Sequence, residues 1–182
     1  MMSEGPGRTQ GLPARVTAPR RLTAQDDVFG FESGKHPALD QWLRERALTS
    51  EGFSARTYVI CAIDPPRRVV GYYAIATAME QREVLPTAKL RRGMPERVPF
   101  LLLARLAVDR TFQGMGLGAH LLSDALRRCL SASEIAGTRG VVAHAIDQDA
   151  VQFYQHHGFV LSPLGERVML MPIEAVRALF PD

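Results

Sequence analysis

The sequence contains little of what marks the specialised classes of protein. Among its 182 residues there are only two cysteines, Cys61 in an apolar, strand-like run and Cys129 on a predicted helix face. We expect both to be buried, reduced thiols, which argues against a disulfide framework and a cysteine-based metal site. No apolar run approaches the length of a membrane span, and the run at 100–104 already ends at Arg105. We therefore expect neither a bound metal nor an association with membranes.

The composition is that of an ordinary globular protein, with 46% hydrophobic and 23% charged residues. The first twenty residues have no apolar signal core, so we expect a cytoplasmic protein. A chain of this length favours one domain. We expect a flexible tail over 1–14, where Gly and Pro are frequent, and a single domain over 15–182.

Positive charge is concentrated in two segments, although the net charge is only +3. One is the N-terminal segment, with Arg8, Arg15, Arg20 and Arg21. The other is a stretch punctuated by Pro and Gly and opposed only by Glu96; its basic residues are Lys89, Arg91, Arg92 and Arg97. Such a stretch is typical either of a solvated surface or of a contact with an acidic partner such as RNA.

Hydrophobic patterns predict both strands and helices. The predicted strands cover 16–22, 57–63, 69–76, 100–108, 140–146, 159–161 and 167–171. Predicted helices begin at Pro37, at Leu117, after Asp147 as N-cap, and at Pro172, and the connection 80–98 has room for a short helix. The fold class is therefore α/β, with a mixed, mostly antiparallel sheet flanked by helices. The strand 100–108 is apolar on both faces, which places it in the centre of the sheet.

Three glycines at alternate positions, Gly114, Gly116 and Gly118, follow this central strand and open the next helix. Glycine leaves backbone N–H groups unobstructed, and a helix N-terminus favours negative charge. The segment therefore predicts a cradle for a phosphate-bearing cofactor.

Spacing and context separate the cofactor classes. A mononucleotide loop needs Gly-Lys-Ser/Thr, and Gly34-Lys35-His36 fails at its third position. The dinucleotide pattern G-x-G-x-x-G/A is met by Gly114, Gly116 and Ala119. Its acidic partner should end the next strand, however, whereas Glu134 precedes that strand. Context therefore disfavours the dinucleotide interpretation.

The pattern Leu106-Ala107-Val108-Asp109, followed by Phe112-Gln113-Gly114, Gly116 and Gly118, resembles the acetyl-CoA-binding motif of the GNAT family of N-acetyltransferases. The second signature of that family corresponds to 149–159, in the expected order along the chain. The resemblance extends from about residue 20 to the end of the chain. It implies the acyl-CoA N-acyltransferase fold, with acetyl-CoA as the co-substrate.

The resemblance also implies site residues. It places the pantetheine arm along the backbone of Leu106, Ala107 and Val108, and Asp147 and Phe153 near the cofactor; a core position is the alternative for Phe153. The pyrophosphate would rest on N–H groups of Gln113, Gly114, Met115, Gly116, Leu117, Gly118 and Ala119. Tyr154 corresponds to the tyrosine that often serves as general acid, because a phenol can protonate the departing CoA thiolate. The alternative is a core tyrosine, which would need a hydrogen-bond partner of its own.

No carboxylate base is evident beside the cradle. The preceding connection offers only Glu80 and Glu83, and His144, His156 and His157 belong to no supporting pattern. An α-amine titrates near pH ~8, and an ester at its carbonyl lowers that value further, whereas a lysine amine titrates near ~10.4. The sequence therefore favours an α-amine as the acceptor, because such an amine is largely neutral without help.

A narrower resemblance points to the same acceptor. The segments 31–34, 56–59, 70–73 and 103–109 are similar to those of the acetyltransferase toxins of bacterial toxin–antitoxin modules. That group acetylates the amino group of aminoacyl-tRNA and so blocks translation; its members usually dimerise and are neutralised by a small ribbon-helix-helix antitoxin. The resemblance thus implies aminoacyl-tRNA as substrate, a homodimer and such an antitoxin. It further implies tRNA contacts from Lys35, Lys89, Arg91, Arg92 and Arg97.

Two other functions remain open at this point. One is the acetylation of a small amine or a protein N-terminus, although a small-molecule enzyme would carry acidic specificity residues and the segment 80–98 is basic. The other is a non-catalytic regulator that binds acyl-CoA or RNA, against which the presence of Tyr154 argues.

Overall fold

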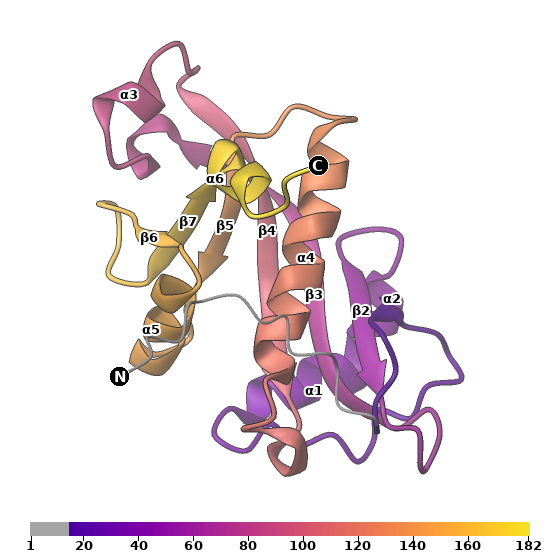
Figure 1. Cartoon of the computed structure of the whole chain (residues 1–182). Coiled ribbons are helices and arrows are strands. Elements are labelled where there is room, and N and C mark those ends of the chain that lie inside the picture. Colours follow the sequence, from indigo (N-terminus) through magenta and orange to yellow (C-terminus); the bar gives the residue numbers. More distant parts are fainter. Residues whose placement is uncertain (1–14) are drawn as a thin grey trace, which may run out of the picture.

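The computed structural model describes residues 15–182, and the predicted tail 1–14 lies outside the described residues. The centre of the structure is a seven-stranded sheet with the strand order β1-β2-β3-β4-β5-β7-β6. Neighbouring strands are antiparallel except β4 and β5, which run parallel. The predicted mixed, mostly antiparallel sheet with flanking helices is confirmed (Figure 1).

The elements follow one another in nearly the predicted order. The first part of the chain forms β1 (Arg20–Arg21), α1 (Pro37–Glu45), α2 (Ala47–Ser50), β2 (Arg56–Cys61), β3 (Val69–Gln81), the 3-10 turn η1 (Arg82–Val84), α3 (Ala88–Arg91) and β4 (Arg97–Val108). The second part forms the 3-10 turn η2 (Arg110–Phe112), α4 (Leu117–Ser133), β5 (Gly140–His144), α5 (Gln148–His156), β6 (Val160–Leu161), β7 (Val168–Pro172) and α6 (Ile173–Ala178). None of the helices in this described part is both long and apolar enough to cross a bilayer.

The largest differences between predicted and observed strand boundaries are in β1, β3 and β4, whereas the other strands shift by one or two residues at their ends. The strand predicted over 16–22 is reduced to β1, because Pro19 cannot donate a ladder hydrogen bond and Val16 forms only an isolated bridge with Ala62. The strands β3 and β4 are longer than predicted, because they pair with each other as far as Gln81 and Arg97. This pairing takes up both ends of the predicted connection 80–98, and the short helix expected there is α3.

Helices cover both faces of the sheet. Tyr72 and Tyr73 are neighbours in β3, so their side chains point to opposite faces. Tyr73 packs in a core with Leu121 of α4 and Tyr154 of α5, whereas Tyr72 packs with Leu43 of α1. We call the face of the sheet that packs on α4 the α4 face, and the opposite face, which packs on α1, the α1 face. Both tyrosines are fully buried, so the centre of β3 holds the two halves of the core together.

The segment that follows β3 turns back over the α1 face. Val84 and Leu85 pack against Val142 of β5 and Leu170 of β7. The Ser162 hydroxyl fixes this crossing by donating to the Val84 carbonyl oxygen at 2.8 Å. The crossing therefore lays the segment after β3 over β5, which is separated from β3 in the sheet by β4 alone.

Candidate active site

A gap opens in the sheet where β4 and β5 separate. The two strands pair only at 101–103 and 141–143, whereas β4 continues along β3 as far as Val108. The Asp109 N–H donates to the Val70 carbonyl oxygen at 2.8 Å. Because hydrogen bonds alternate along an antiparallel pair, the polar backbone groups of Leu106 and Val108 point away from β3 into the gap, and those of Ala107 point into the sheet. A ligand in the gap therefore meets an open strand edge at two of the three predicted residues.

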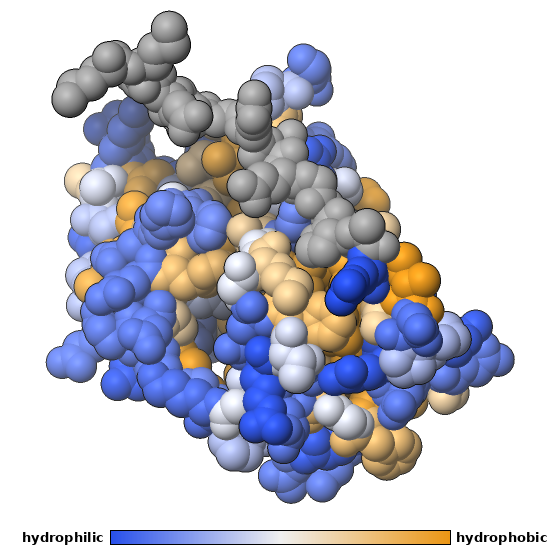
Figure 2. Space-filling model, turned by 60° about the horizontal axis from the view of Figure 1, so that its bottom comes forward, coloured by the Kyte–Doolittle hydropathy of each residue, from blue (hydrophilic) through white to orange (hydrophobic). Residues whose placement is uncertain are grey.

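The gap contains a cavity of about 250 Å³ that is lined from both faces of the sheet. Its lining residues come from α1, β4, the end of β5 and α5: Ala38, Leu39, Leu103, Ala104, Arg105, Leu106, His144, Ile146, Ala150 and Tyr154. Figure 2 shows this end of the molecule, where hydrophilic residues dominate the rim and apolar residues lie in a hollow between them. The cavity connects the two faces, so two reactants approaching from opposite sides meet in it.

The predicted phosphate cradle forms the start of α4. Gly114 and Gly116 have positive φ values of +79° and +80°, and a Cβ built on either would meet no atom of residues 15–182 within 4 Å. Gly116 is the N-cap of α4, and no side chain of the described residues caps the helix. The first N–H groups of a helix have no intrahelical acceptor, so those of Leu117, Gly118 and Ala119 are available to an anion. The macrodipole of a 17-residue helix adds to this preference.

Several side chains of the cradle have structural tasks of their own. The Gln113 Nε2 group donates to the carbonyl oxygens of Ser33 (2.8 Å) and Val108 (2.9 Å), which ties the cradle to the segment before α1 and to β4. Leu117 is buried in the core, and Met115 is half exposed at the tip. An added Cβ on Gly118 would lie 3.5 Å from the Phe153 ring, so Phe153 packs against the first turn of α4. This contact agrees with the core interpretation of Phe153.

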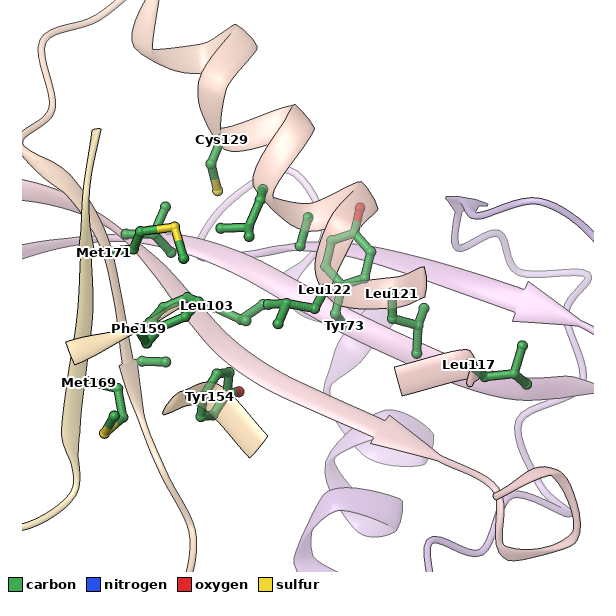
Figure 3. Packing of buried hydrophobic residues seen from close by; sticks show 14 of the residues in the cluster. Tyr73, Leu103, Leu117, Leu121, Leu122, Cys129, Tyr154, Phe159, Met169 and Met171 are labelled. Carbon is green, nitrogen blue, oxygen red and sulfur yellow. The ribbon is translucent and has the colours of Figure 1, made fainter. Parts of the chain in front are cut away.

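Tyr154 enters the cavity from α5 and is only 7% exposed. Its ring packs on Phe159, with the ring centroids 5.1 Å apart, and Figure 3 shows the hydroxyl turned away from Phe159 and Met169. Tyr72 and Tyr73 donate their hydroxyls to the Leu39 carbonyl oxygen and to Asp124, but the Tyr154 hydroxyl has no hydrogen-bond partner among residues 15–182. Burial raises the pKa of Tyr154 far above its ordinary value. The group is therefore a protonated donor without an acceptor in the described part of the chain.

Charged residues join the start of α1 to the start of α5 beside the gap. The Asp147 carboxylate caps α5 by accepting from the Ala150 N–H at 2.8 Å. It also pairs with Lys35 Nζ at 2.9 Å and with His36 Nε2 at 2.7 Å. The helix N–H and the two partners hold the pKa of Asp147 well below its usual range. Lys35 also pairs with Asp149 at 3.1 Å, so this predicted tRNA contact is already engaged with acidic groups.

The α1 face of the cavity carries residues that sequence reasoning did not assign. The Arg105 guanidinium lies over the Trp42 ring, 4.5 Å from its centroid, and that ring stacks on Tyr72. His144 lines the cavity at the end of β5, with its Nε2 3.7 Å from Glu80 Oε1. The signal for Arg105 was its charge inside the apolar strand 100–108. The contact of His144 with Glu80 had no signal in the sequence, because it joins the ends of two strands, β5 and β3, that do not pair with each other.

The other predicted basic residues are near α3. Lys89, Arg92 and Arg97 are exposed, whereas the Arg91 Nε donates to the Leu85 carbonyl oxygen at 2.6 Å and stabilises the loop. Figure 1 places α3 and α1 at opposite ends of the molecule. A continuous basic patch that includes Lys35 is therefore not formed. Residues 15–182 also contain no cluster of three His, Cys, Asp or Glu side chains suited to a metal.

Comparison with known proteins gives consistent matches. Residues 54–161 match the family described as acetyltransferase (GNAT) domain. The chain is 44% identical over 168 residues to a tRNA-acetylating toxin of Mycobacterium tuberculosis, which covers 91% of this chain and 98% of that protein.

Two solved structures of the protein AtaT are similar over almost their whole length. AtaT complexed with acetyl-methionyl-tRNAfMet has 30% sequence identity and a TM-score of 0.83, with 91% of this chain and 99% of that chain covered. A mutant AtaT toxin bound to acetyl-CoA and the C-terminus of the antitoxin AtaR has 28% identity and a TM-score of 0.77, with 92% and 99% covered.

Proposed function

The chain belongs to the GNAT acetyltransferase family, and on that premise we propose that it is a toxin that acetylates the amino group of aminoacyl-tRNA. It is an acetyl-CoA-dependent N-acetyltransferase. The observation that best supports aminoacyl-tRNA as the acetyl acceptor is the 44% identity to a tRNA-acetylating toxin. The match extends over 91% of this chain and includes the whole of the cradle and the cavity. Acetylation of the amino group removes the nucleophile that peptide-bond formation needs, so the product blocks translation.

Acetyl-CoA would bind along the open edge of β4. The Leu106 and Val108 backbone groups would pair with the pantetheine arm, and the N–H groups at 117–119, with the loop from Gln113, would hold the pyrophosphate. Phe153 supports this binding by packing against the first turn of α4. Asp147 caps the helix beside the gap and so positions α5 and Tyr154. In this arrangement the thioester lies in the cavity, close to the Tyr154 hydroxyl.

The acetyl transfer needs a proton at the sulfur. The amine nitrogen attacks the carbonyl carbon of the thioester, the C–S bond breaks, and the CoA thiolate takes a proton from Tyr154. The Tyr154 hydroxyl has no acceptor among residues 15–182, which supports this role because the hydroxyl is free to face the sulfur. The raised pKa keeps the phenol protonated until that moment.

The acceptor would arrive at the α1 face, opposite the cofactor. Lys89, Arg92 and Arg97 are exposed and would contact tRNA phosphates, whereas Arg91 would stabilise their loop. Lys35 would join them only after leaving Asp147 and Asp149, as a contact near the aminoacyl end. Arg105, on the stacked ring of Trp42, lies at the same opening.

The proposed function also implies an oligomeric state, a partner protein and a location in the cell. We expect a homodimer, a ribbon-helix-helix antitoxin that neutralises the enzyme, and a cytoplasmic location, where charged tRNA and acetyl-CoA are both present. We also expect the described residues 15–182 to function as one domain, because one sheet and its helices carry both the cradle and the cavity.

A direct assay tests the acceptor. Purified protein is mixed with acetyl-CoA labelled in the acetyl group and with tRNA that is either aminoacylated or deacylated. We expect label on the charged tRNA alone, and we expect it to leave the tRNA when mild base hydrolyses the aminoacyl ester. Equal label on both tRNAs, or label that survives the hydrolysis, would contradict an aminoacyl acceptor.

A further inference from the structure

We propose that His144, held by Glu80, accepts the proton of the attacking amine. This inference rests on the proposed function and adds a base to it. The sequence assigns no role to His144, and a direct attack by a neutral amine needs no base to begin. The geometry of the α1 face nevertheless places an imidazole and a carboxylate together at the opening where the amine would enter.

The position of His144 follows from the end of β5. Val141 and Ala143 belong to the core on the α4 face, so alternation turns His144 toward the α1 face. It is also the residue at which β5 ends, where the strand has already separated from β4. The side chain is 60% exposed and lines the same cavity as Tyr154. A base and an acid therefore lie on opposite faces of the sheet around one reaction space.

Glu80 gives the imidazole an orientation. Its Oε1 lies 3.7 Å from His144 Nε2, which is ion-pair range but beyond a hydrogen bond, and its side chain is only 25% exposed. A proton on Nε2 would face this carboxylate and leave the lone pair of Nδ1 for the amine. When the imidazole becomes charged, the carboxylate stabilises it. Glu80 is thus a positioning residue and His144 the group that meets the substrate.

The other histidines are placed for different tasks. His36 is engaged with Asp147, and the His157 ring packs on Phe153 with the centroids 4.8 Å apart. His156 is exposed on α5 and contacts His157. His120 lies in α4. Of the five histidines in the sequence, only His144 lines the cavity.

The elements next to His144 also carry charged and titratable groups. Glu80 faces it from β3, Arg105 lines the cavity from β4, and Tyr154 lines it from α5. Arg167 donates to the Ile146 carbonyl oxygen at 3.0 Å, just beyond the end of β5. The opening at the end of β5 therefore carries both positive and negative side chains, and Glu80 is the one within ion-pair range of His144.

The complete step then balances. The Nδ1 atom of His144 takes a proton from the amine as the C–N bond forms, the C–S bond breaks, and Tyr154 gives its proton to the thiolate. Solvent then removes the proton from the imidazolium and returns one to the phenolate. The net change is one proton moved from nitrogen to sulfur and one acetyl group moved from sulfur to nitrogen.

His144→Ala, with His156→Ala as the matched control, tests the inference with acetyl-CoA and charged tRNA as substrates. A positioned base contributes about 100-fold or more, so we expect kcat to fall by about that factor in His144→Ala and to be unchanged in His156→Ala. The KM for acetyl-CoA should stay within about twofold. Added imidazole should restore part of the rate in His144→Ala alone, in proportion to its unprotonated fraction.

Glu80→Gln tests the positioning part. Removing the carboxylate removes the charge that orients the ring, so kcat should fall while the KM for acetyl-CoA stays within about twofold, and added imidazole should restore part of the rate. A merely structural role would lower stability and leave kcat per folded molecule unchanged. The inference is overturned if His144→Ala keeps kcat within threefold, or if its loss is insensitive to imidazole. These results differ from failure of the proposed function, in which the wild type itself would not acetylate charged tRNA.

Discussion

The replacement Tyr154→Phe should separate catalysis from stability. The hydroxyl has no hydrogen-bond partner within residues 15–182, so its removal breaks no bond that holds the fold. We expect the free energy of unfolding to change by less than ~1 kcal/mol, because a buried hydroxyl without a partner gives no net stabilisation. The loss of the proton donor should lower kcat by about 10²–10⁴-fold. That factor corresponds to about 3–5 kcal/mol of the activation barrier.

Tyr73→Phe is the matched control, since the same atom is removed from a tyrosine of the same core. The Tyr73 hydroxyl donates to Asp124, which keeps a second partner in Arg128 at 2.9 Å. We therefore expect a cost of about 1–2 kcal/mol. For a chain of this size such a cost lowers Tm by about 2–8 °C. Activity per folded molecule should be retained, because Tyr73 does not line the cavity.

The assays are acetyl transfer to charged tRNA at saturating acetyl-CoA and thermal unfolding of the same preparations. The expected result is a crossed pattern, in which Tyr154→Phe loses rate and Tyr73→Phe loses stability. A Tyr154→Phe protein that keeps kcat within threefold would refute the role of Tyr154 as general acid. An inactive Tyr154→Phe protein that has also lost several kcal/mol of stability would refute the assignment of a free hydroxyl.

Three further predictions concern the cradle, the charged cluster and the basic loop. Gly116→Ala places a side chain at φ +80°, so we expect about 1–2 kcal/mol of strain and a raised KM for acetyl-CoA. The control Gly93→Ala, at φ +75° outside the cradle, should lower stability by a similar amount and leave the KM for acetyl-CoA unchanged. Equal KM values in the two variants would contradict the cradle. Asp147→Asn should lower stability at neutral pH, measured by denaturant unfolding. The folded pKa of Asp147 is depressed, so its contribution to stability is present above the unfolded pKa near ~3.9 and is lost as the pH falls below it. The free energies of unfolding of the two proteins should therefore become equal only in acid. Equal stabilities already near pH 6 would contradict this. Neutralising the three exposed cations of the loop, Lys89, Arg92 and Arg97, should raise the KM for tRNA. It should also reduce the salt dependence of tRNA binding, the slope of log K against log salt concentration, by about 2–3, with acetyl-CoA kinetics as the control. An unchanged slope would show that the loop does not contact tRNA.

Local chemistry made much of the fold predictable. Apolar runs predicted most of the strands, and the glycines predicted the start of the helix α4. The N-cap at Asp147 was predicted from one residue type and is confirmed by its 2.8 Å bond from Ala150. These features depend on residues within a few positions of one another, so the sequence alone contains their causes.

Features that depend on distant segments were less accessible. Pairing of β3 with β4 to Gln81 overrides the polar character of residues near 80, because the ladder supplies hydrogen bonds regardless of side chain. Lys35 was predicted as a tRNA contact, but its ion pairs with Asp147 and Asp149 span more than a hundred positions of the chain. The contact of His144 with Glu80 likewise joins the ends of β5 and β3, two strands separated in the sheet by β4. Spacing cannot reveal such contacts, since they follow from the packing of whole elements.

The central claim is that the acetyl group goes to the α-amine of the amino acid on tRNA. It is tested most directly by digesting the reacted tRNA with a nuclease and identifying the 3′-terminal fragment by mass spectrometry. The account predicts an N-acetyl-aminoacyl adenosine whose formation requires both acetyl-CoA and prior aminoacylation. Acetyl groups found on tRNA bases, or on protein amines while the aminoacyl adenosine stays unmodified, would contradict it.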